Sequence, residues 1–209
     1  MKTVQLMAIG LLLVSSFSCK EAKKEADKVG DEIENKETFT VVADSTTIKF
    51  TAYKTTDKKG VRGEFTTVNL KNAEAKTSTI DALNGLEFSI PISSLFTNDA
   101  TKTRDPKIME FFFGVMDSTE FISGTFKFDD AEKCSIELKL NGVTANLPME
   151  YSVTDGRHIS FSGVMNLEKW NALDAVASLN KACEELHKGT DGVSKTWNVV
   201  AIEATTYLK

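Results

Sequence analysis

The sequence predicts an all-β domain, an antiparallel β-barrel or closed sandwich, with one amphipathic helix near its C-terminus and an N-terminal signal and tether. Three observations lead to this class. Short segments rich in β-branched and aromatic residues recur along the chain, as is typical of strands. Polar turns separate these segments at even spacing, which favours a sandwich or a barrel. A single segment, residues 167–189, has the apolar period of a helix.

Residues 1–18 have the layout of a secretory signal peptide. The apolar run at residues 4–14 is about 11 residues long, shorter than the roughly 20 that cross a bilayer, so a retained transmembrane helix is the weaker alternative. Residues 16–19, Ser-Phe-Ser-Cys, resemble a bacterial lipobox, although phenylalanine replaces the usual small residue. We therefore expect a lipoprotein of the cell envelope, anchored to the membrane through acylated Cys19, in the periplasm or at the outer membrane, with surface exposure left open. A secreted protein cut near Ser18 is the alternative.

Residues 19–37 predict a charged tether between the anchor and the domain. This stretch is dense in both charge signs and contains no aromatic residue. A narrow apolar stripe at helical spacing is interrupted by Gly30, so a frayed helix and a disordered arm are both open. The remaining residues, 38–209, have the length of one domain.

Nine segments within residues 38–209 have the composition of β-strands. They are residues 39–42, 47–53, 63–70, 86–92, 120–128, 135–140, 145–153, 158–165 and 197–207. Asn141-Gly142 and Asp155-Gly156 are hairpin signals between consecutive strands. Closure into a barrel would remove the exposed edges of so many short strands.

Residues 167–189 interrupt this pattern with one amphipathic helix. Its apolar face is formed by Trp170, Leu173, Val176, Ala177, Cys183 and Leu186, and Gly189 stands just beyond its end. An apolar stripe usually packs on a core, so we expect the helix to cover an open end or flank of the sheet. A lid over a cavity is the alternative.

The chain holds 13 phenylalanines, and many of them fall on the inward face of the strands. Alternation places Phe65 and Phe88 inward, and in one of two registers Phe126 and Phe128 as well. An eight-stranded barrel is either just filled by its side chains or able to hold one small ligand. Alternation along the strands leaves both possibilities open.

Residues 103–121 concentrate apolar side chains without a strand's alternation or a helix's single stripe. Ile108, Met109, Phe111, Phe112 and Phe113 lie within six positions of one another. Such a segment must be covered by the protein's own core, by a ligand or by a membrane.

The same segment carries a family resemblance. Thr-Arg-Asp at residues 103–105, three phenylalanines at 111–113 and Asp-Ser-Thr-Glu-Phe at 117–121 resemble a signature of the YceI-like family, lipocalin-like β-barrels of bacterial envelopes that bind polyisoprenoid lipids. Residues 41–70, 138–153 and 197–208 resemble the family's opening strands, a later hairpin and its closing strand. Ser45-Thr46 departs from the histidine-serine pair of many members, and the helix at 167–189 is longer than the family's segment.

The resemblance implies a lipocalin-like barrel that holds or shuttles an amphiphilic polyisoprenoid, of the quinone or prenyl phosphate type, without chemistry. The ligand-binding residues would be Phe65, Phe88, Ile108, Met109, Phe111, Phe112, Phe113, Phe126 and Phe128, with Arg104 near the mouth. There Arg104, Lys102 or Lys107 could offer charge to a phosphate. A structural Arg104-Asp105 pair is the alternative, and we prefer it for Asp105. A solidly packed barrel that serves as an interaction module of the envelope is the alternative function, and a homodimer is open.

Several function classes find no support in the sequence. His158 and His187 lie far apart and outside any metal-binding spacing, and no nucleophile elbow, P-loop or dinucleotide fingerprint occurs. The adjacent pair Asp129-Asp130 more often caps a hairpin in water than performs acid–base chemistry. The net charge is −5, without a basic patch interleaved with aromatics, so no nucleic-acid partner is expected. We expect no catalytic residue, no metal and no cofactor other than a bound lipid.

Two cysteines, Cys134 and Cys183, remain after Cys19 is lipidated. An oxidising compartment allows them to form a disulfide. They lie on segments of different predicted type, which favours two buried free thiols.

Overall fold

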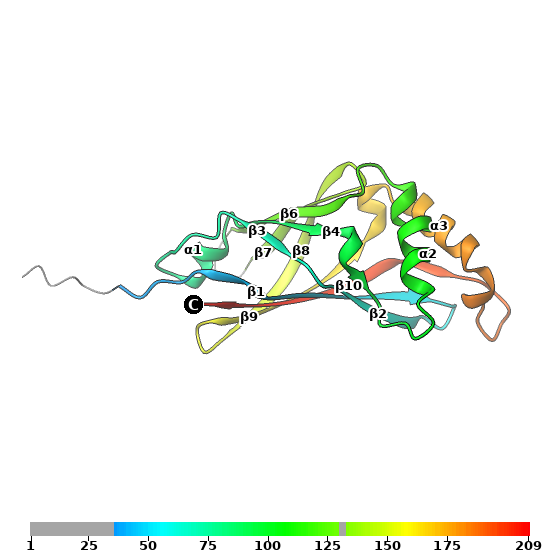
Figure 1. Cartoon of the computed structure of the whole chain (residues 1–209), viewed down its shortest axis with the longest axis horizontal. Coiled ribbons are helices and arrows are strands. Elements are labelled where there is room, and N and C mark those ends of the chain that lie inside the picture. Colours follow the sequence, from blue (N-terminus) through cyan, green and yellow to red (C-terminus); the bar gives the residue numbers. More distant parts are fainter. Residues whose placement is uncertain (1–35, 130–132) are drawn as a thin grey trace, which may run out of the picture. The chain divides into compact units, whose positions relative to one another are not determined.

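The computed structural model describes residues 36–129 and 133–209. The signal peptide, Cys19, the tether up to residue 35 and Asp130 lie outside the described residues. The described chain is dominated by one antiparallel sheet that curls around its own interior (Figure 1). Its strands are β1 (Val41–Lys54), β2 (Lys59–Phe65), β3 (Asn69–Lys71), β4 (Glu87–Pro91), β5 (Leu95–Phe96), β6 (Phe121–Phe128), β7 (Cys134–Leu140), β8 (Val143–Thr154), β9 (His158–Asn166) and β10 (Thr196–Leu208).

The sheet closes because two of its segments are bent. The strand order is β3-β4-β6-β7-β8-β9-β10-β1-β2-β5, so β3 and β5 stand at its ends. β3 follows β2 along the chain and pairs with β4, while β5 follows β4 and pairs with β2. Between the two short ladders, the Thr66 N–H donates to the Ser94 carbonyl at 2.9 Å. With β2/β3 and β4/β5 each counted as one bent strand, the described residues form an eight-stranded barrel, which confirms the predicted class.

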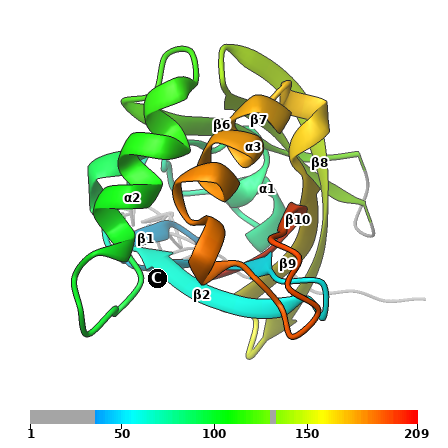
Figure 2. The same ribbon diagram turned by 90° about the vertical axis from the view of Figure 1, so that its right-hand side faces the viewer.

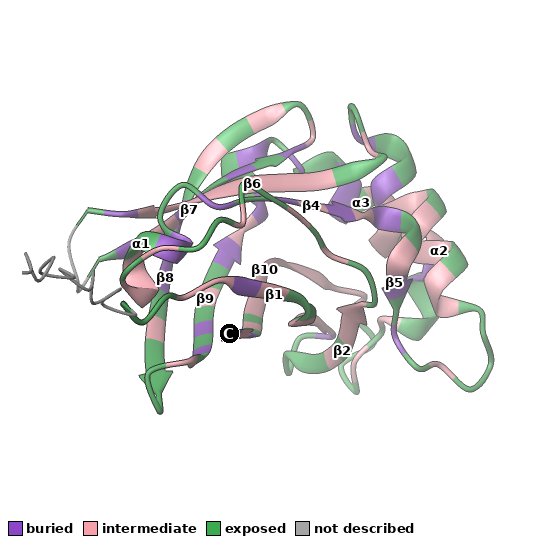
Figure 3. Cartoon of the chain, turned by 60° about the vertical axis from the view of Figure 1, so that its left-hand side comes forward, coloured by how far each residue is buried: buried purple, intermediate pink, exposed green. Residues whose placement is uncertain are grey.

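Alternation along the strands separates the interior from the solvent face. In β7, Cys134, Ile136, Leu138 and Leu140 are buried, and the residues between them are not. Successive side chains of a strand point to opposite faces, so the sequence pattern sets which face turns inward. The same banding runs along β9 in Figure 3.

Helices cover one end of the barrel (Figure 2). They are α2 (Arg104–Phe111) with the 3-10 turn η2 (Phe113–Val115), and α3 (Leu173–Ala182) flanked by η3 (Leu167–Trp170) and η4 (Glu184–Leu186). The short α1 (Thr79–Leu83) lies toward the opposite end (Figure 1), and η1 (Ile92–Ser94) joins β4 to β5. None of the described helices has the length and apolar content to cross a membrane.

The prediction of one continuous helix over residues 167–189 was wrong. Asn171 adopts a left-handed conformation with φ 52° and ends η3 before α3 begins. The side-chain amide of Asn141 donates to the Trp170 and Asn171 carbonyls at 2.9 and 3.0 Å. These carbonyls are thus bonded to the β7–β8 turn, and asparagine tolerates the left-handed region that the break requires.

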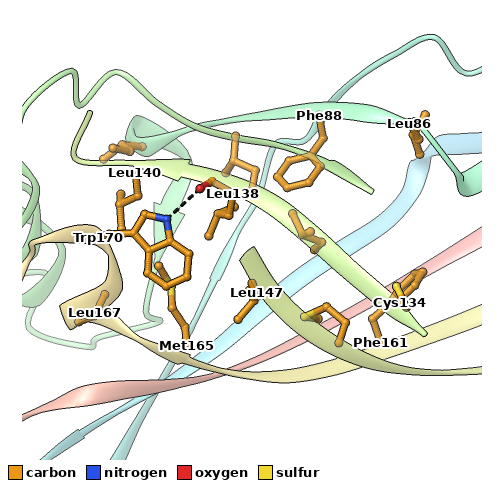
Figure 4. Packing of buried hydrophobic residues seen from close by; sticks show 14 of the residues in the cluster. Leu86, Phe88, Cys134, Leu138, Leu140, Leu147, Phe161, Met165, Leu167 and Trp170 are labelled. Carbon is orange, nitrogen blue, oxygen red and sulfur yellow. Dashed lines mark hydrogen bonds between the residues drawn. The ribbon is translucent and has the colours of Figure 1, made fainter. Parts of the chain in front are cut away.

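The buried core is anchored by Trp170, which is 0% exposed. Its indole Nε1 donates to the Leu138 carbonyl on β7 at 2.8 Å, and Leu140, Met165 and Leu167 lie around the ring (Figure 4). A buried indole that satisfies its one donor contributes both apolar area and orientation. Trp170 therefore fastens η3 to the sheet.

The two described cysteines are free and buried, which agrees with the hypothesis of free thiols. Cys134 lies on β7, and Cys183 follows α3. Burial raises the pKa of the Cys134 thiol to about 11. Because the thiolate is the reactive form, Cys134 is a structural residue.

Candidate functional site

The barrel encloses a cavity of about 200 Å³. An engineered apolar cavity of about 150 Å³ already binds benzene, so this volume is large enough for an organic guest. β1, β2, β4 and β6 to β10 all contribute to the wall, and α2, η2 and α3 contribute at the helical end. The interior is therefore not filled by side chains, contrary to the alternative of a solidly packed barrel.

The cavity runs along most of the barrel. Both Thr196 and Thr206, near the two ends of β10, line it, as do Val200, Ile202 and Ala204 between them. Ten residues of strand span roughly 33 Å, or about 25 Å along the axis at the usual tilt of barrel strands. The shape suits an extended chain better than a compact ring.

The wall offers a ligand almost no free hydrogen-bond donor or acceptor. Apart from apolar side chains it contains four threonines and Trp197. The Thr46 and Thr206 hydroxyls bond each other at 2.8 Å, and the Thr205 hydroxyl bonds that of Thr47 at the same distance. Among the residues that the structure describes, no buried side-chain nitrogen or oxygen lacks a partner.

At the helical end the remaining polar wall atoms are also paired. The Trp197 indole donates to the Thr55 carbonyl at 2.8 Å. The Thr196 hydroxyl donates to Asn180 Oδ1 at 2.9 Å. A ligand with its own polar groups in the cavity would lose hydrogen bonds to water without gaining replacements. The wall therefore selects for an apolar ligand.

Six of the ten residues predicted to bind the ligand lie together on this wall. They are Phe65, Phe88, Ile108, Phe112, Phe113 and Phe126. The rings of Phe88 and Phe126 are 5.7 Å apart, and the ring of Phe161 on β9 is 5.1 Å from that of Phe126. Phe88, Phe126 and Phe161, far apart in the sequence, thus form one aromatic cluster on the wall.

The other four predicted residues do not reach the wall. Met109 packs against the core from α2, and Phe111 is half-buried on the same helix. Phe128 is buried near the end of β6, where its ring meets Tyr151 at 5.3 Å. Arg104 lies 3.5 Å from the Asp99 carboxylate. Helical geometry explains α2, because Ile108 and Phe112 are one turn apart and share a face that Met109 does not share.

Asp105 has a structural role, as the sequence analysis preferred, but its partner is Thr97, whereas Arg104 pairs with Asp99. Its carboxylate accepts from the Thr97 hydroxyl and, at 3.4 Å, from the Thr97 N–H. Asp99 accepts the N–H groups of Thr103 and Arg104 at 3.1 and 3.2 Å. Both carboxylates hold the loop that leads into α2, and so they position Ile108 and Phe112 over the cavity.

Sequence reasoning missed the aliphatic part of the wall and its polar end. Leu138, Leu147, Val200 and Ile202 line the cavity together with the phenylalanines. The alternation in residues 197–207 could have identified the last two. No short-range signal could have placed His187, which follows η4, beside the wall.

His187 is half-buried at the helical end, with Nδ1 2.6 Å from the Thr196 hydroxyl. Because that hydroxyl donates to Asn180, the imidazole donates to Thr196 through Nδ1–H. Burial, and then the positive charges of Lys54 and Lys107, lower the pKa of His187 to about 4. The imidazole is therefore neutral at pH 7.

This shift predicts a pH-dependent stability. As pH falls below the ordinary histidine value near 6.5, the unfolded chain takes up a proton that folded His187 refuses, so the free energy of unfolding decreases until pH about 4. The full shift corresponds to about 3 kcal/mol, and solvent screening reduces it to an expected 1–2 kcal/mol. In His187→Asn this loss between pH 7 and 4.5 should disappear from urea unfolding curves.

The matched control is His158→Asn, because His158 is exposed on β9. Carboxylates titrate in all three proteins, so only the difference between variant and parent is informative. A pH dependence in His187→Asn as steep as in the parent would contradict the assignment.

The wall has no reactive machinery. No acid, base or thiol of the described residues lines the cavity. Nor does any group of three histidine, cysteine or carboxylate side chains in residues 36–129 and 133–209 have metal-binding geometry. The arrangement can hold an apolar molecule and shield it from water.

Comparison with known proteins gives the same picture. The family model of the YceI-like domain matches residues 39–205. A polyisoprenoid binding domain from Saccharophagus degradans is 10% identical, with a TM-score of 0.59 over 82% of this chain and 97% of that one. BcnA of Burkholderia cenocepacia is 13% identical, with a TM-score of 0.53 over 81% and 99%. No curated protein sequence matches the chain. At these identities the structural likeness establishes the fold.

Proposed function

Because this chain belongs to the YceI-like family, we propose that its barrel binds one amphiphilic polyisoprenoid lipid, of the quinone or prenyl phosphate type, and holds or carries it without chemistry. One observation carries the proposal, namely a long cavity whose wall is apolar and whose few polar atoms are already paired. The polyisoprenoid binding domain from Saccharophagus degradans, which shares the fold, supports the choice of lipid.

The energetics fit a prenyl chain. Each buried methylene contributes about 0.8 kcal/mol, so fifteen carbons contribute about 12 kcal/mol, and about 8 kcal/mol net corresponds to a micromolar complex. Association and ordering cost at least about 4 kcal/mol. A chain of several isoprene units offsets that cost through apolar contact alone, and its polar head can remain at the end of the cavity.

The location is part of the same proposal, and the N-terminal sequence pattern supports it. The apolar run before Cys19 and the charged stretch after it support an envelope lipoprotein on a short tether. Two or more acyl chains would anchor it stably, whereas one chain binds only marginally. Such an anchor would keep the barrel within reach of the membrane that holds its ligand.

Lipid analysis tests the proposal directly. The full-length protein, expressed in a bacterial envelope and purified, should carry a prenyl lipid near one per chain, detected by native mass spectrometry and by solvent extraction. Protein that yields no prenyl lipid, and takes none up from added lipid, would contradict the proposal.

Two adjacent phenylalanines provide a mutational test. Phe112 lines the cavity and its ring lies 5.0 Å from that of Phe113, whereas Phe111 is half-buried outside the wall. Phe112→Asp should remove most bound lipid, because a carboxylate in an apolar wall must be desolvated. Phe111→Asp introduces the same charge one position away and should retain the lipid. Circular dichroism of both variants checks folding, and equal lipid content would contradict the placement of Phe112.

A further inference from the structure

Polar and charged side chains meet at the helical end of the cavity. Thr196, on the wall, stands opposite Lys54 in the ladder between β1 and β10. His187 bonds the Thr196 hydroxyl from the other side. Lys54 Nζ donates to the Leu186 carbonyl at 2.9 Å, a bond that holds the ammonium beside this end. The ammonium of Lys54 and the imidazole of His187 therefore flank the Thr196 hydroxyl of the wall.

Helix α2 adds positive charge to the same place. It crosses this end of the barrel beside α3 and carries Arg104 and Lys107, one turn apart (Figure 2). Burial, and then the charges of Lys59 and Arg104, lower the pKa of Lys54. The positive charge of Lys107 likewise helps to lower the pKa of His187. Lys59 and Arg104 therefore lie near Lys54, and Lys107 lies near His187.

Little negative charge offsets them. Within residues 36–129 and 133–209, no carboxylate lies within ion-pair distance of Lys54, Lys59 or Lys107. Arg104 lies 3.5 Å from the Asp99 carboxylate. The whole chain has a net charge of −5, so this concentration of cations runs against the overall balance. An anionic group at the end of the cavity would relieve the repulsion, whereas a neutral one would not.

We propose that Lys54, Lys107 and Arg104 form a headgroup subsite that makes the barrel selective for polyisoprenoids ending in phosphate or diphosphate over prenols and quinones of the same length. The inference rests on the proposed function, since it assigns the head of a lipid whose chain fills the cavity. Lysine and arginine form short, charge-assisted hydrogen bonds to phosphate oxygens, which a neutral quinone carbonyl cannot match. The end of the cavity then binds the head group, and the wall accommodates the prenyl chain.

Ligands with one chain and different heads test this assignment. The full-length protein, stripped of co-purified lipid, is titrated with geranylgeranyl diphosphate, with geranylgeraniol and with a quinone bearing the same prenyl chain. We expect the diphosphate to bind about 30-fold more tightly than either neutral ligand, as two charge-assisted contacts allow. The preference should shrink at high salt. Inorganic diphosphate alone should compete only weakly, because it lacks the chain.

Charge variants locate the subsite. Lys54→Gln combined with Lys107→Gln should lower the affinity for the diphosphate at least about 10-fold and leave geranylgeraniol binding unchanged. Lys49→Gln combined with Lys127→Gln makes the same change in net charge, at an exposed position of β1 and at a residue of β6 paired with Glu137. That control should alter neither ligand.

The outcomes separate the two proposals. Equal binding of all three prenyl ligands, or a diphosphate preference that survives loss of both lysines, overturns the headgroup subsite and leaves the proposed function intact. Failure of every prenyl ligand to bind overturns the proposed function itself. Inorganic diphosphate binding as tightly as the lipid would identify an anion site independent of the cavity, and would also overturn the subsite.

Discussion

Ala204→Trp should abolish lipid binding while the barrel remains folded. Ala204 lies on the wall of the cavity, between Ile48 on β1 and Phe161 on β9 in the sheet register. An indole at this position would occupy the space that the prenyl chain needs. Loss of four or more buried methylenes, at about 0.8 kcal/mol each, lowers the affinity at least about 100-fold. Because the new ring enters empty volume, the free energy of unfolding should change by less than about 1 kcal/mol.

Ala201→Trp is the matched control. Ala201 belongs to the same strand, but it stands beside Val164, which is 66% exposed on the outer face of β9. This variant should keep both its lipid and its stability. The measurements are lipid content after extraction and urea unfolding, made on both variants and the parent. Retained lipid in Ala204→Trp with an unchanged fold would place the ligand somewhere other than the cavity.

Trp170→Ala should cause the largest loss of stability of any single change considered. The side chain is 0% exposed, and its removal leaves a cavity among Leu140, Met165 and Leu167. Large-to-small substitutions of buried aromatics cost about 3–5 kcal/mol. The Leu138 carbonyl also loses its partner, which adds about 1 kcal/mol or more. Urea denaturation measures the total.

Trp170→Phe separates the two contributions. It removes the donor and keeps one six-membered aromatic ring, so the packing loss is smaller than in Trp170→Ala and we expect a total loss of about 1–3 kcal/mol. Leu173→Ala provides a surface control, because Leu173 on α3 is 44% exposed. If Trp170→Ala were no more damaging than Leu173→Ala, Trp170 would not be the fastening point between η3 and the sheet.

The strands could be predicted from sequence because their alternation is a local property. Residues 135–140 and 158–165 correspond closely to β7 and β9. Residues 63–70 were expected to form one strand but bend between β2 and β3, where pairing changes from β5 to β4. That change depends on pairing with β4 and β5, which lie outside the segment, so alternation within the segment could not reveal it.

The helical end of the barrel could be predicted from the sequence less well than the strands. The break at Asn171 depends on hydrogen bonds from Asn141, thirty residues earlier in the chain. Residues 104–111 form a helix although their apolar residues do not follow one stripe. The reason is that some of these residues face the cavity and others pack against the core. Their inward residues Ile108 and Phe112 were predicted through a family resemblance and not through periodicity.

The residues of the site also divide into those that a local sequence pattern predicts and those that only the fold brings together. Phe65 and Phe88 followed from alternation, because an inward face is a period-two property, whereas alternation left the register of Phe126 open. The cationic end unites Lys54, Lys107 and His187 from three distant segments, so only the fold brings them together. Arg104 was predicted near the mouth; it does not line the wall, and its charge helps to lower the pKa of Lys54.

The paired hydroxyls of the cavity wall have a consequence for which molecules the protein can distinguish. An apolar wall whose threonine hydroxyls bond one another offers a long ligand no fixed polar contact. Such a guest can slide lengthwise by one repeat at little energetic cost, and double-bond geometry or branching is sensed only through bulk. On the proposed function, the barrel would accept many prenyl chains and limit them only by length.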